Sequence, residues 1–287
     1  MGRIAYVNGR FVPHREAAVH IEDRGYQLAD AVYEVWAVMD GRLADAEGHF
    51  ARLGRSLAEL KIREPMSRRA LEMVMREALR RNRVREGLIY LQVSRGVAPR
   101  DHAFPGDDVA PAVVITAKSL DRAAVEAKAA KGVGVVTVPE NRWGRCDIKT
   151  VGLLPNALAR QQAKEAGAYE ALFVDELGMI TEGAASNAWI LDQDGVLRTR
   201  DTNANILRGI TRRTLMDVIA ETGLPFQERP FTVEEAKSAK EVFVTGAGSL
   251  VLPVVSIDGQ KVGNGAPGPV AMRLRRLYIE RARATAL

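Results

Sequence analysis

The sequence predicts a mixed α/β (α+β) fold in two domains. Segments in which apolar and polar residues alternate, as in strands, are interspersed with segments of helical periodicity. The chain has 287 residues, 47% of them hydrophobic, which is enough for two cores of ordinary size. No repeat of fixed period appears, so a solenoid or a propeller is not expected. We therefore expect an N-terminal α/β domain over residues 1–119, a connector over 120–132 and a C-terminal α/β domain over 133–287.

The chain is predicted to begin with strands. Residues 4–7 end at Asn8-Gly9, a dipeptide typical of a tight hairpin turn, and residues 11–12 and 17–21 continue the β pattern. A longer strand is predicted over residues 31–39, closed by Asp40-Gly41.

Alternation along residues 31–39 assigns side chains to two faces of a sheet. Tyr33, Val35 and Ala37 are predicted on one face. The other face is predicted to carry Glu34, Trp36 and Val38.

Two helices and two further strands are predicted in the N-terminal domain. Residues 47–60 carry apolar side chains at helical spacing, and residues 67–82 begin with Ser67, a good N-cap. Strands are predicted over residues 88–94 and 112–117. The Ala-, Lys- and Glu-rich stretch that follows them predicts a connector with some helix.

The C-terminal domain is predicted to mix strands and helices. Its predicted strands cover residues 133–138, 169–174, 186–191 and 241–245. Its predicted helices cover residues 155–166 and 211–222, and a short helix begins at Thr232, where Thr232 and Glu235 match a capping box.

Composition limits the class of protein. Cys146 is the only cysteine, so an intramolecular disulfide is excluded and a reducing compartment is favoured over a secreted setting. The N-terminal residues lack a signal-peptide pattern and no apolar run is long enough to span a membrane, so we expect a cytoplasmic protein with no membrane partner. The formal charge is +5, but the arginines are scattered along helices, which indicates solvated faces rather than a nucleic-acid site. The four histidines do not form a metal cluster, so no metal is expected.

Two single residues are candidates for chemistry. Lys149 lies where a loop leads toward a helix, and a lysine nucleophile must reach into a partly desolvated pocket. Glu182 lies after a strand of buried character and before small residues that allow close approach of a ligand. Taken locally, the sequence favours an ordinary surface lysine and a solvent-exposed turn glutamate over these functional roles. Cys146 as a nucleophile is the weaker alternative, because no His or Asn lies near it in the sequence.

Three segments are candidates for binding anions. Residues 209–211 open a predicted helix, whose first N–H groups suit a phosphate, and residues 246–249 form a second Gly-rich turn. Arg100 and His102 share one loop, where an arginine fork matches a carboxylate. A plain helix start and a solvated loop remain the alternatives for these segments.

The order of these pieces resembles the class IV, fold-type IV aminotransferases that use pyridoxal 5′-phosphate (PLP). The matching segments appear in the family's order over nearly the whole chain; they are residues 22–27, 30–35, 49–53, 142–149, 181–187 and 207–211. The resemblance implies two α/β domains with the cofactor in the cleft between them, and a homodimer.

The resemblance also implies roles for residues of this chain. Lys149 would hold PLP as a Schiff base and shuttle the Cα proton as the catalytic residue, and Glu182 would pair with the pyridine nitrogen. Arg52 would hold the phosphate. The other cofactor-binding residues implied are Leu207 on the ring face, the backbone of Gly209, Ile210, Thr211, Gly246 and Ala247, and Ser186 and Asn187.

Within the family, the loop Arg95 to Pro105 is most similar to that of the D-amino-acid (D-alanine) transaminase subgroup. By this resemblance, Tyr33, Arg100 and His102 of this chain would orient the substrate carboxylate. Val35 would be a further substrate contact. The implied function is ping-pong transamination of D-amino acids, of the type D-alanine plus 2-oxoglutarate giving pyruvate and D-glutamate.

Several alternatives stay open at the level of the sequence. A branched-chain L-amino-acid transaminase, an (R)-amine transaminase and an aminodeoxychorismate lyase share the fold, and a basic binding protein without catalysis belongs to another class. The chain also departs from the family pattern, because Ala184 and Ala185 replace frequent hydroxyl residues and Ala247 lies in a turn that is usually rich in Ser and Thr. These departures predict that these two segments contact the phosphate through backbone groups alone.

Overall fold

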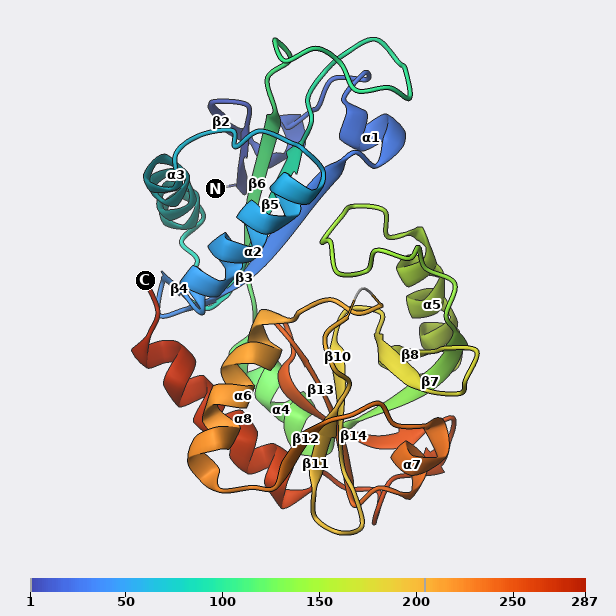
Figure 1. The fold of residues 1–287 in the computed structure, drawn as a ribbon. Helices are drawn as coiled ribbons and strands as arrows, with labels where there is room; N and C mark the ends of the chain where they lie inside the picture. Colours follow the sequence, from blue (N-terminus) through green and yellow to red (C-terminus); the bar gives the residue numbers. More distant parts are fainter. Residues whose placement is uncertain (1, 204) are drawn as a thin grey trace. The chain divides into compact units, whose positions relative to one another are not determined.

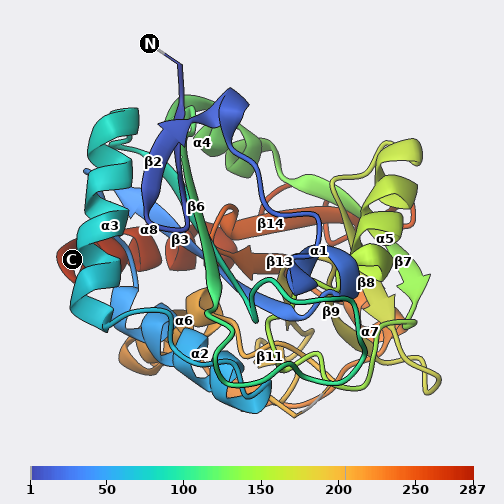
Figure 2. The ribbon, with the colours of Figure 1, turned by 90° about the horizontal axis from the view of Figure 1, so that it is seen from above.

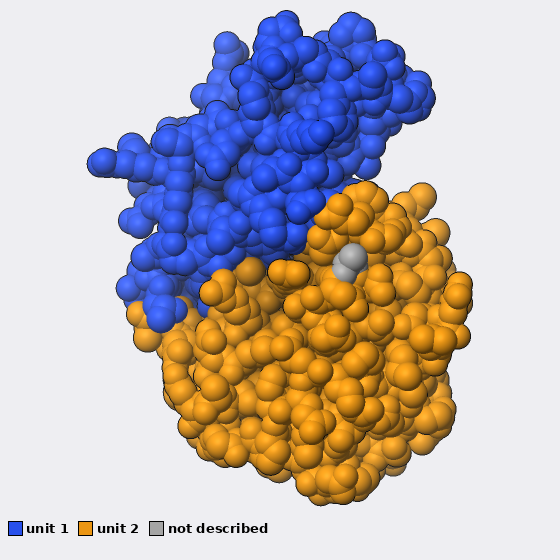
Figure 3. Space-filling view, in the orientation of Figure 1, with its two compact units in different colours: residues 1–121, 148–152, 285–287 blue, residues 122–147, 153–284 orange. Residues whose placement is uncertain are grey.

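The computed structural model describes residues 2–203 and 205–287 and shows two compact units. Unit 1 comprises Met1–Asp121, Ile148–Gly152 and Thr285–Leu287, and unit 2 comprises Arg122–Asp147 and Leu153–Ala284 (Figure 3). Helices and strands occur in both units, so the mixed α/β class predicted from the sequence is confirmed.

Unit 1 is built on a six-stranded sheet with the order β2-β1-β6-β5-β3-β4, and neighbouring strands in it are antiparallel. The strands are β1 (Ile4–Val7), β2 (Arg10–Pro13), β3 (Ala31–Met39), β4 (Arg42–Leu43), β5 (Gly87–Ser94) and β6 (Ala112–Ser119). Its helical segments are η1 (His14–Glu16), α1 (Arg24–Leu28), α2 (Ala46–Glu59) and α3 (Arg68–Asn82).

Helices α2 and α3 cover one face of this sheet (Figures 1 and 2). Trp36 of β3 packs against Phe50 of α2, and Met75 of α3 joins the same core. The Ser67 hydroxyl accepts a hydrogen bond from the Ala70 N–H at 3.3 Å, which confirms the predicted N-cap of α3.

One predicted strand of unit 1 is wrong. Residues 17–21 form no strand; they follow η1 and lead into the N-cap of α1. Residues 18–21 are exposed, so their β-like composition buries no side chain against a sheet face.

Unit 2 contains a nine-stranded mixed sheet with the order β12-β11-β10-β13-β14-β7-β8-β9, and β15 pairs with β14. The strands are β7 (Val133–Pro139), β8 (Glu170–Val174), β9 (Ile180–Gly183), β10 (Asn187–Leu191), β11 (Leu197–Thr199), β12 (Phe226–Glu228), β13 (Glu241–Gly246), β14 (Leu250–Ile257) and β15 (Gln260–Lys261). The helices are α4 (Arg122–Lys131), α5 (Leu154–Glu165), α6 (Ile210–Thr222), α7 (Val233–Ser238) and α8 (Pro269–Ala284).

Local sequence signals account for several ends of these elements. Gly223 ends α6 with φ +69°, a conformation that suits glycine, and the Thr232–Glu235 capping box begins α7 as predicted. Glu182 was predicted to follow a strand. In the structure it lies within β9, whose residues are all buried and which pairs with β8.

The predicted division into two domains and a connector differs from the two observed units around residues 120–152. The expected connector contains the helix α4, and Ile148–Gly152 belongs to unit 1 although the residues around it belong to unit 2. The physical reason is backbone pairing, because Val32 and Thr150 form a β-bridge and the Val151 N–H donates to the Ala31 carbonyl at 3.1 Å.

Candidate active site

Lys149 lies on the short extended segment that joins unit 1. The Tyr33 N–H donates to the Lys149 carbonyl at 3.0 Å, and the Lys149 N–H donates to the Ser56 hydroxyl of α2 at 3.5 Å. The Lys149 Nζ lies 4.2 Å from the centroid of the Tyr33 ring. The fold therefore brings together two of the residues singled out in the sequence, and β3 and α2 fix the backbone of the lysine.

Tyr33 and Val35 lie on the face of β3 that is not packed into the core. Both are half-buried, whereas Glu34 and Trp36 between and beside them are buried, so the predicted alternation is confirmed. The Tyr33 ring stacks on Tyr90 with 5.6 Å between centroids. Burial raises the pKa of the Tyr90 hydroxyl to about 12, so this group stays neutral and donates to Gln92 at 2.7 Å. The wall beside Lys149 is thus formed by two stacked aromatic rings.

Arg52 lies on the opposite side of β3 from Tyr33, in a buried ionic cluster. Its Nε and Nη2 donate to the two carboxylate oxygens of Glu34 at 2.6 and 2.8 Å, and His49 Nδ1 lies 2.8 Å from Glu34. Burial alone would raise the pKa of the Glu34 carboxyl, but the charge and hydrogen bonds of Arg52 hold it well below its usual range. Glu34 therefore fixes the guanidinium plane of Arg52.

Arg100 and His102 lie exposed on the loop that joins β5 to β6. Within residues 2–203 and 205–287, no hydrogen bond or ion pair joins either side chain to Tyr33. The structure therefore does not assemble the three predicted carboxylate-binding residues through direct contacts.

Glu182 has a dense set of hydrogen-bond donors in unit 2. Its carboxylate accepts from Arg142 Nη1, from Asn187 Nδ2 at 3.0 Å, and from the Leu207 N–H at 3.1 and 3.2 Å. Donors of this kind favour the ionised carboxylate in a buried position. Glu182 is thus a buried, fixed negative charge, and the exposed-turn interpretation of this residue is wrong.

Arg142 is the cationic partner that a buried Glu182 requires, and the sequence pattern did not assign it that role. It also donates to Glu140, whose second oxygen accepts from the Thr181 hydroxyl at 2.7 Å. Burial opposes the charge of Arg142, but its hydrogen bonds to Glu140 and the charges of both carboxylates raise its pKa above the usual value. Forty residues separate Arg142 from Glu182 in the chain, so no local spacing could reveal the pair.

The two Gly-rich segments and β10 pack closely at one end of the unit 2 sheet. A Cβ added to Gly209, the N-cap of α6, would lie 2.0 Å from Asn187 Oδ1, and one added to Gly246 would lie 3.0 Å from the Ala185 carbonyl. Asn187 also donates to the Leu207 carbonyl at 3.0 Å. The absence of side chains at both glycines is what allows the backbone of the three segments to approach.

The remaining predicted cofactor residues belong to the same region. Ile210 and Thr211 form the buried first turn of α6, whose N–H groups have no partner within the helix. Ala247 follows Gly246 in the β13–β14 turn and is half-buried. The Ser186 hydroxyl donates to Glu170 at 3.2 Å, so it is engaged with a carboxylate in this structure.

Cys146 is not set up as a nucleophile. Its thiol is half-buried and donates to the Trp143 carbonyl at 3.1 Å. Burial, helped by nearby carboxylates and opposed by Arg142, raises the pKa of the thiol to about 11, so the reactive thiolate is scarce at neutral pH.

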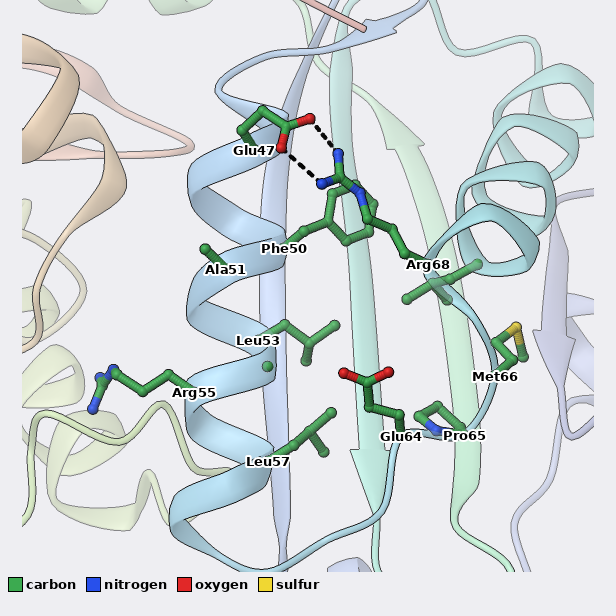
Figure 4. Close-up of a pocket in the computed structure, with 12 residues that line it drawn as sticks. Glu47, Phe50, Ala51, Leu53, Arg55, Leu57, Glu64, Pro65, Met66 and Arg68 are labelled. Carbon is green, nitrogen blue, oxygen red and sulfur yellow. Dashed lines mark hydrogen bonds and ion pairs between the residues drawn. The ribbon is translucent and has the colours of Figure 1, made fainter.

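A separate pocket of about 350 Å³ lies in unit 1 between α2, the loop after it and the start of α3 (Figure 4). Phe50, Leu53 and Leu57 are among its apolar lining residues, and two of its four charged residues, Glu47 and Arg68, pair with each other. None of the predicted site residues lines it.

The described part of the chain lacks two features. It contains no helix that combines the length and the apolar character of a membrane span. Nor does it contain a group of three or more His, Cys, Asp or Glu side chains placed to hold a metal ion.

Known proteins are similar to this chain in both sequence and structure. It is 41% identical over 279 residues to a D-alanine aminotransferase of Staphylococcus haemolyticus, covering 96% of this chain and 97% of the relative. It is 41% identical over 268 residues to one of Bacillus licheniformis, covering 93% of each. Among solved structures, the branched-chain amino acid aminotransferase of Escherichia coli superposes with a TM-score of 0.90 at 25% identity, over 98% of this chain and 95% of that one.

A second solved structure was determined with a relevant ligand. The T.th. branched-chain amino acid aminotransferase with pyridoxamine 5′-phosphate superposes with a TM-score of 0.87 at 28% identity, over 98% of this chain and 94% of that one. The class IV amino-transferase family matches residues 31–257 of this chain. Since that match spans well over half of the chain, the protein belongs to the class IV aminotransferases, enzymes of fold type IV that use PLP.

Proposed function

We propose that the protein transfers the amino group of a D-amino acid to a 2-oxo acid by a ping-pong mechanism, with D-alanine and 2-oxoglutarate giving pyruvate and D-glutamate. The observation that carries this is the 39–41% identity to D-alanine aminotransferases over nearly the whole chain. The loop with Arg100 and His102, which resembles that of the D-specific subgroup, supports the same specificity.

The donor set of the protein fits PLP. A lysine amine, a buried carboxylate with fixed donors and a helix start without side-chain obstruction match the aldehyde, the pyridine nitrogen and the phosphate of this cofactor. When bound, PLP supplies the aldehyde that takes up the amino group and a ring that accepts electrons released at Cα.

Lys149 is proposed to hold the cofactor and to move the substrate Cα proton. Its backbone is fixed by hydrogen bonds to β3 and α2, so the side chain is the part that moves. An amine that both accepts and returns one proton acts as a general base and then a general acid.

Glu182 is proposed to keep the pyridine nitrogen protonated. Arg142, Asn187 and the Leu207 N–H favour its ionised form and fix its orientation. Leu207 is proposed to pack on the ring face.

Phosphate binding is assigned to the α6 start and Arg52. The N–H groups of Gly209, Ile210 and Thr211 and those of Gly246 and Ala247 are backbone donors that need no hydroxyl side chain. Arg52 would add a charge that Glu34 orients. Ser186 and Asn187 are proposed to line the same site.

The substrate carboxylate is proposed to be oriented by four side chains, those of Tyr33, Val35, Arg100 and His102. Its orientation decides which Cα hydrogen faces Lys149.

The protein is also proposed to act as a cytoplasmic homodimer. Support for a self-association surface comes from apolar side chains that are 75% and 74% exposed, Ile21 and Tyr26. Light scattering after gel filtration tests the dimer, and a monomer would contradict it.

A comparison of D- and L-alanine tests the main proposal. With PLP-loaded protein and 2-oxoglutarate, pyruvate is expected to form from D-alanine at least tenfold faster than from L-alanine. Faster turnover of L-alanine would overturn the specificity. The second candidate, a branched-chain L-amino-acid transaminase, is favoured by structural similarity to such enzymes. L-leucine is therefore included as a third donor, and a higher kcat/KM for it would favour that candidate.

A further inference from the structure

The loop between β5 and β6 needs a restraint if its side chains are to bind a carboxylate. Arg100 and His102 are exposed on it, and exposed loops are mobile unless they are tied to the scaffold. Recognition of a carboxylate by an arginine fork depends on fixed geometry. The backbone of this loop is therefore the part of unit 1 where a structural tie would matter for substrate binding.

Arg24 supplies such a tie from α1, which lies beside the loop (Figure 1). Its side chain is only 3% exposed. Its Nη1 donates to the Asp101 carbonyl at 2.6 Å, and its Nη2 donates to the His102 carbonyl at 3.4 Å. The guanidinium thus contacts the backbone of His102 and of the residue between the two predicted carboxylate binders.

Asp30 holds Arg24 in this orientation. Its carboxylate accepts from Arg24 Nε at 2.8 Å and from Arg95 at 2.7 and 3.0 Å. Burial alone would raise the pKa of Asp30, but the hydrogen bonds and charges of Arg95 and Arg24 lower it below its usual value. One carboxylate therefore aligns two guanidinium groups.

Arg95 anchors the cluster to the rest of unit 1 and contacts the far side of the loop. It donates to the Leu60 and Lys61 carbonyls just after α2, at 2.7 and 2.9 Å. Its Cζ lies 3.6 Å from the centroid of the Phe104 ring. Arg24 thus holds two backbone carbonyls of the loop, and Arg95 contacts the aromatic side chain of Phe104 in the same loop.

We propose that Arg24, Asp30 and Arg95 form a clamp that fixes the loop carrying Arg100 and His102, and that Arg24 is a positioning residue for the substrate carboxylate. Among the residues that the structure describes, the hydrogen bonds of these three side chains join no predicted cofactor residue, so we expect loss of the clamp to weaken substrate binding and to leave cofactor binding intact. This inference rests on the proposed function for its substrate, and on the unit 1 contacts alone for the clamp.

The test uses Arg24→Gln and Arg24→Lys in the PLP-loaded protein. Lysine keeps the charge beside Asp30 but cannot donate to both carbonyls through a planar fork, so it serves if the glutamine variant fails to fold. The control is Arg80→Gln, which removes an exposed guanidinium on α3 of the same unit. Two quantities are measured: deuterium uptake by residues 96–110, and kcat and KM for D-alanine together with the Kd of PLP.

The clamp predicts faster deuterium uptake by residues 96–110 and a KM for D-alanine raised about tenfold or more in both Arg24 variants. The Kd of PLP is expected to stay within twofold of the wild-type value, and Arg80→Gln is expected to change none of these quantities. Unchanged uptake overturns the clamp. Faster uptake with an unchanged KM overturns the positioning role. A wild-type protein that forms no pyruvate from D-alanine refutes the proposed function, while the exchange measurement still decides the clamp.

Discussion

Replacing Glu34 by Gln removes a buried charge while keeping the shape of the side chain. Glu34 is 0% exposed and pairs with Arg52 through two hydrogen bonds of 2.6 and 2.8 Å. The amide removes the charge that Glu34 presents to the buried guanidinium, and losing one partner of a buried ion pair costs about 3–5 kcal/mol. At roughly 2–4 °C per kcal/mol, we expect the Tm to fall by about 6–20 °C.

Thermal unfolding of the PLP-free protein, followed by circular dichroism, measures this loss. A double-mutant cycle with Arg52→Met isolates the pair, since Glu34→Gln should cost much less when the cation is absent. Glu77→Gln on α3 is the control, because its carboxylate pairs with the exposed Arg80 and Arg81 and such surface pairs contribute little to stability. A loss below about 1 kcal/mol, or an equal loss in both backgrounds, would refute the reasoning.

The same ion pair predicts how pH changes the difference in the free energy of unfolding between wild type and Glu34→Gln. The pKa of Glu34 is lowered by folding from its usual value of 4.5, so its contribution is complete above that pH and is lost as the pH falls below it. The difference in the free energy of unfolding is therefore expected to be constant near neutrality and to shrink in acid. A difference that grows below pH 4.5 would contradict the assignment.

Four other outcomes are expected. Lys149→Ala should abolish the absorbance band of the PLP Schiff base, and a retained Schiff-base band would remove Lys149 from its role. Arg142→Met should lower the stability by about 3–5 kcal/mol and weaken PLP binding, because it leaves two carboxylates without their cation; a variant with wild-type PLP affinity would argue against the support of Glu182. Gly209→Ala should cost about 1–3 kcal/mol and reduce PLP affinity, because its Cβ would lie 2.0 Å from Asn187 Oδ1; neutral behaviour in both assays would count against the packing argument. Alkylation of Cys146 should keep accelerating up to about pH 11, and a plateau near the ordinary thiol pKa of 9.0 would show that burial does not control it.

Local patterns determined most of the elements and some of the residues of the site. Helical spacing located α2 and α3, the Thr232–Glu235 capping box located α7, and alternation placed Tyr33 and Glu34 on opposite faces of β3. These features depend on residues a few positions apart, which is the range over which helix and strand geometry repeats. The order of motifs along the chain was likewise enough for the family.

Only the tertiary structure decided which charged side chains and partners contact one another. Arg142 with Glu182, Arg24 with the Asp101 carbonyl and Lys149 with Tyr33 are brought together from distant parts of the chain. No sequence period links such residues, because the pairing follows from the strand order and from the need of buried charges for partners. The sequence alone also predicted a strand over residues 17–21, which form no strand in the structure and are largely exposed. What the amino-acid order determines is the type of each element and the family; the packing of the sheets decides which side chains hold which.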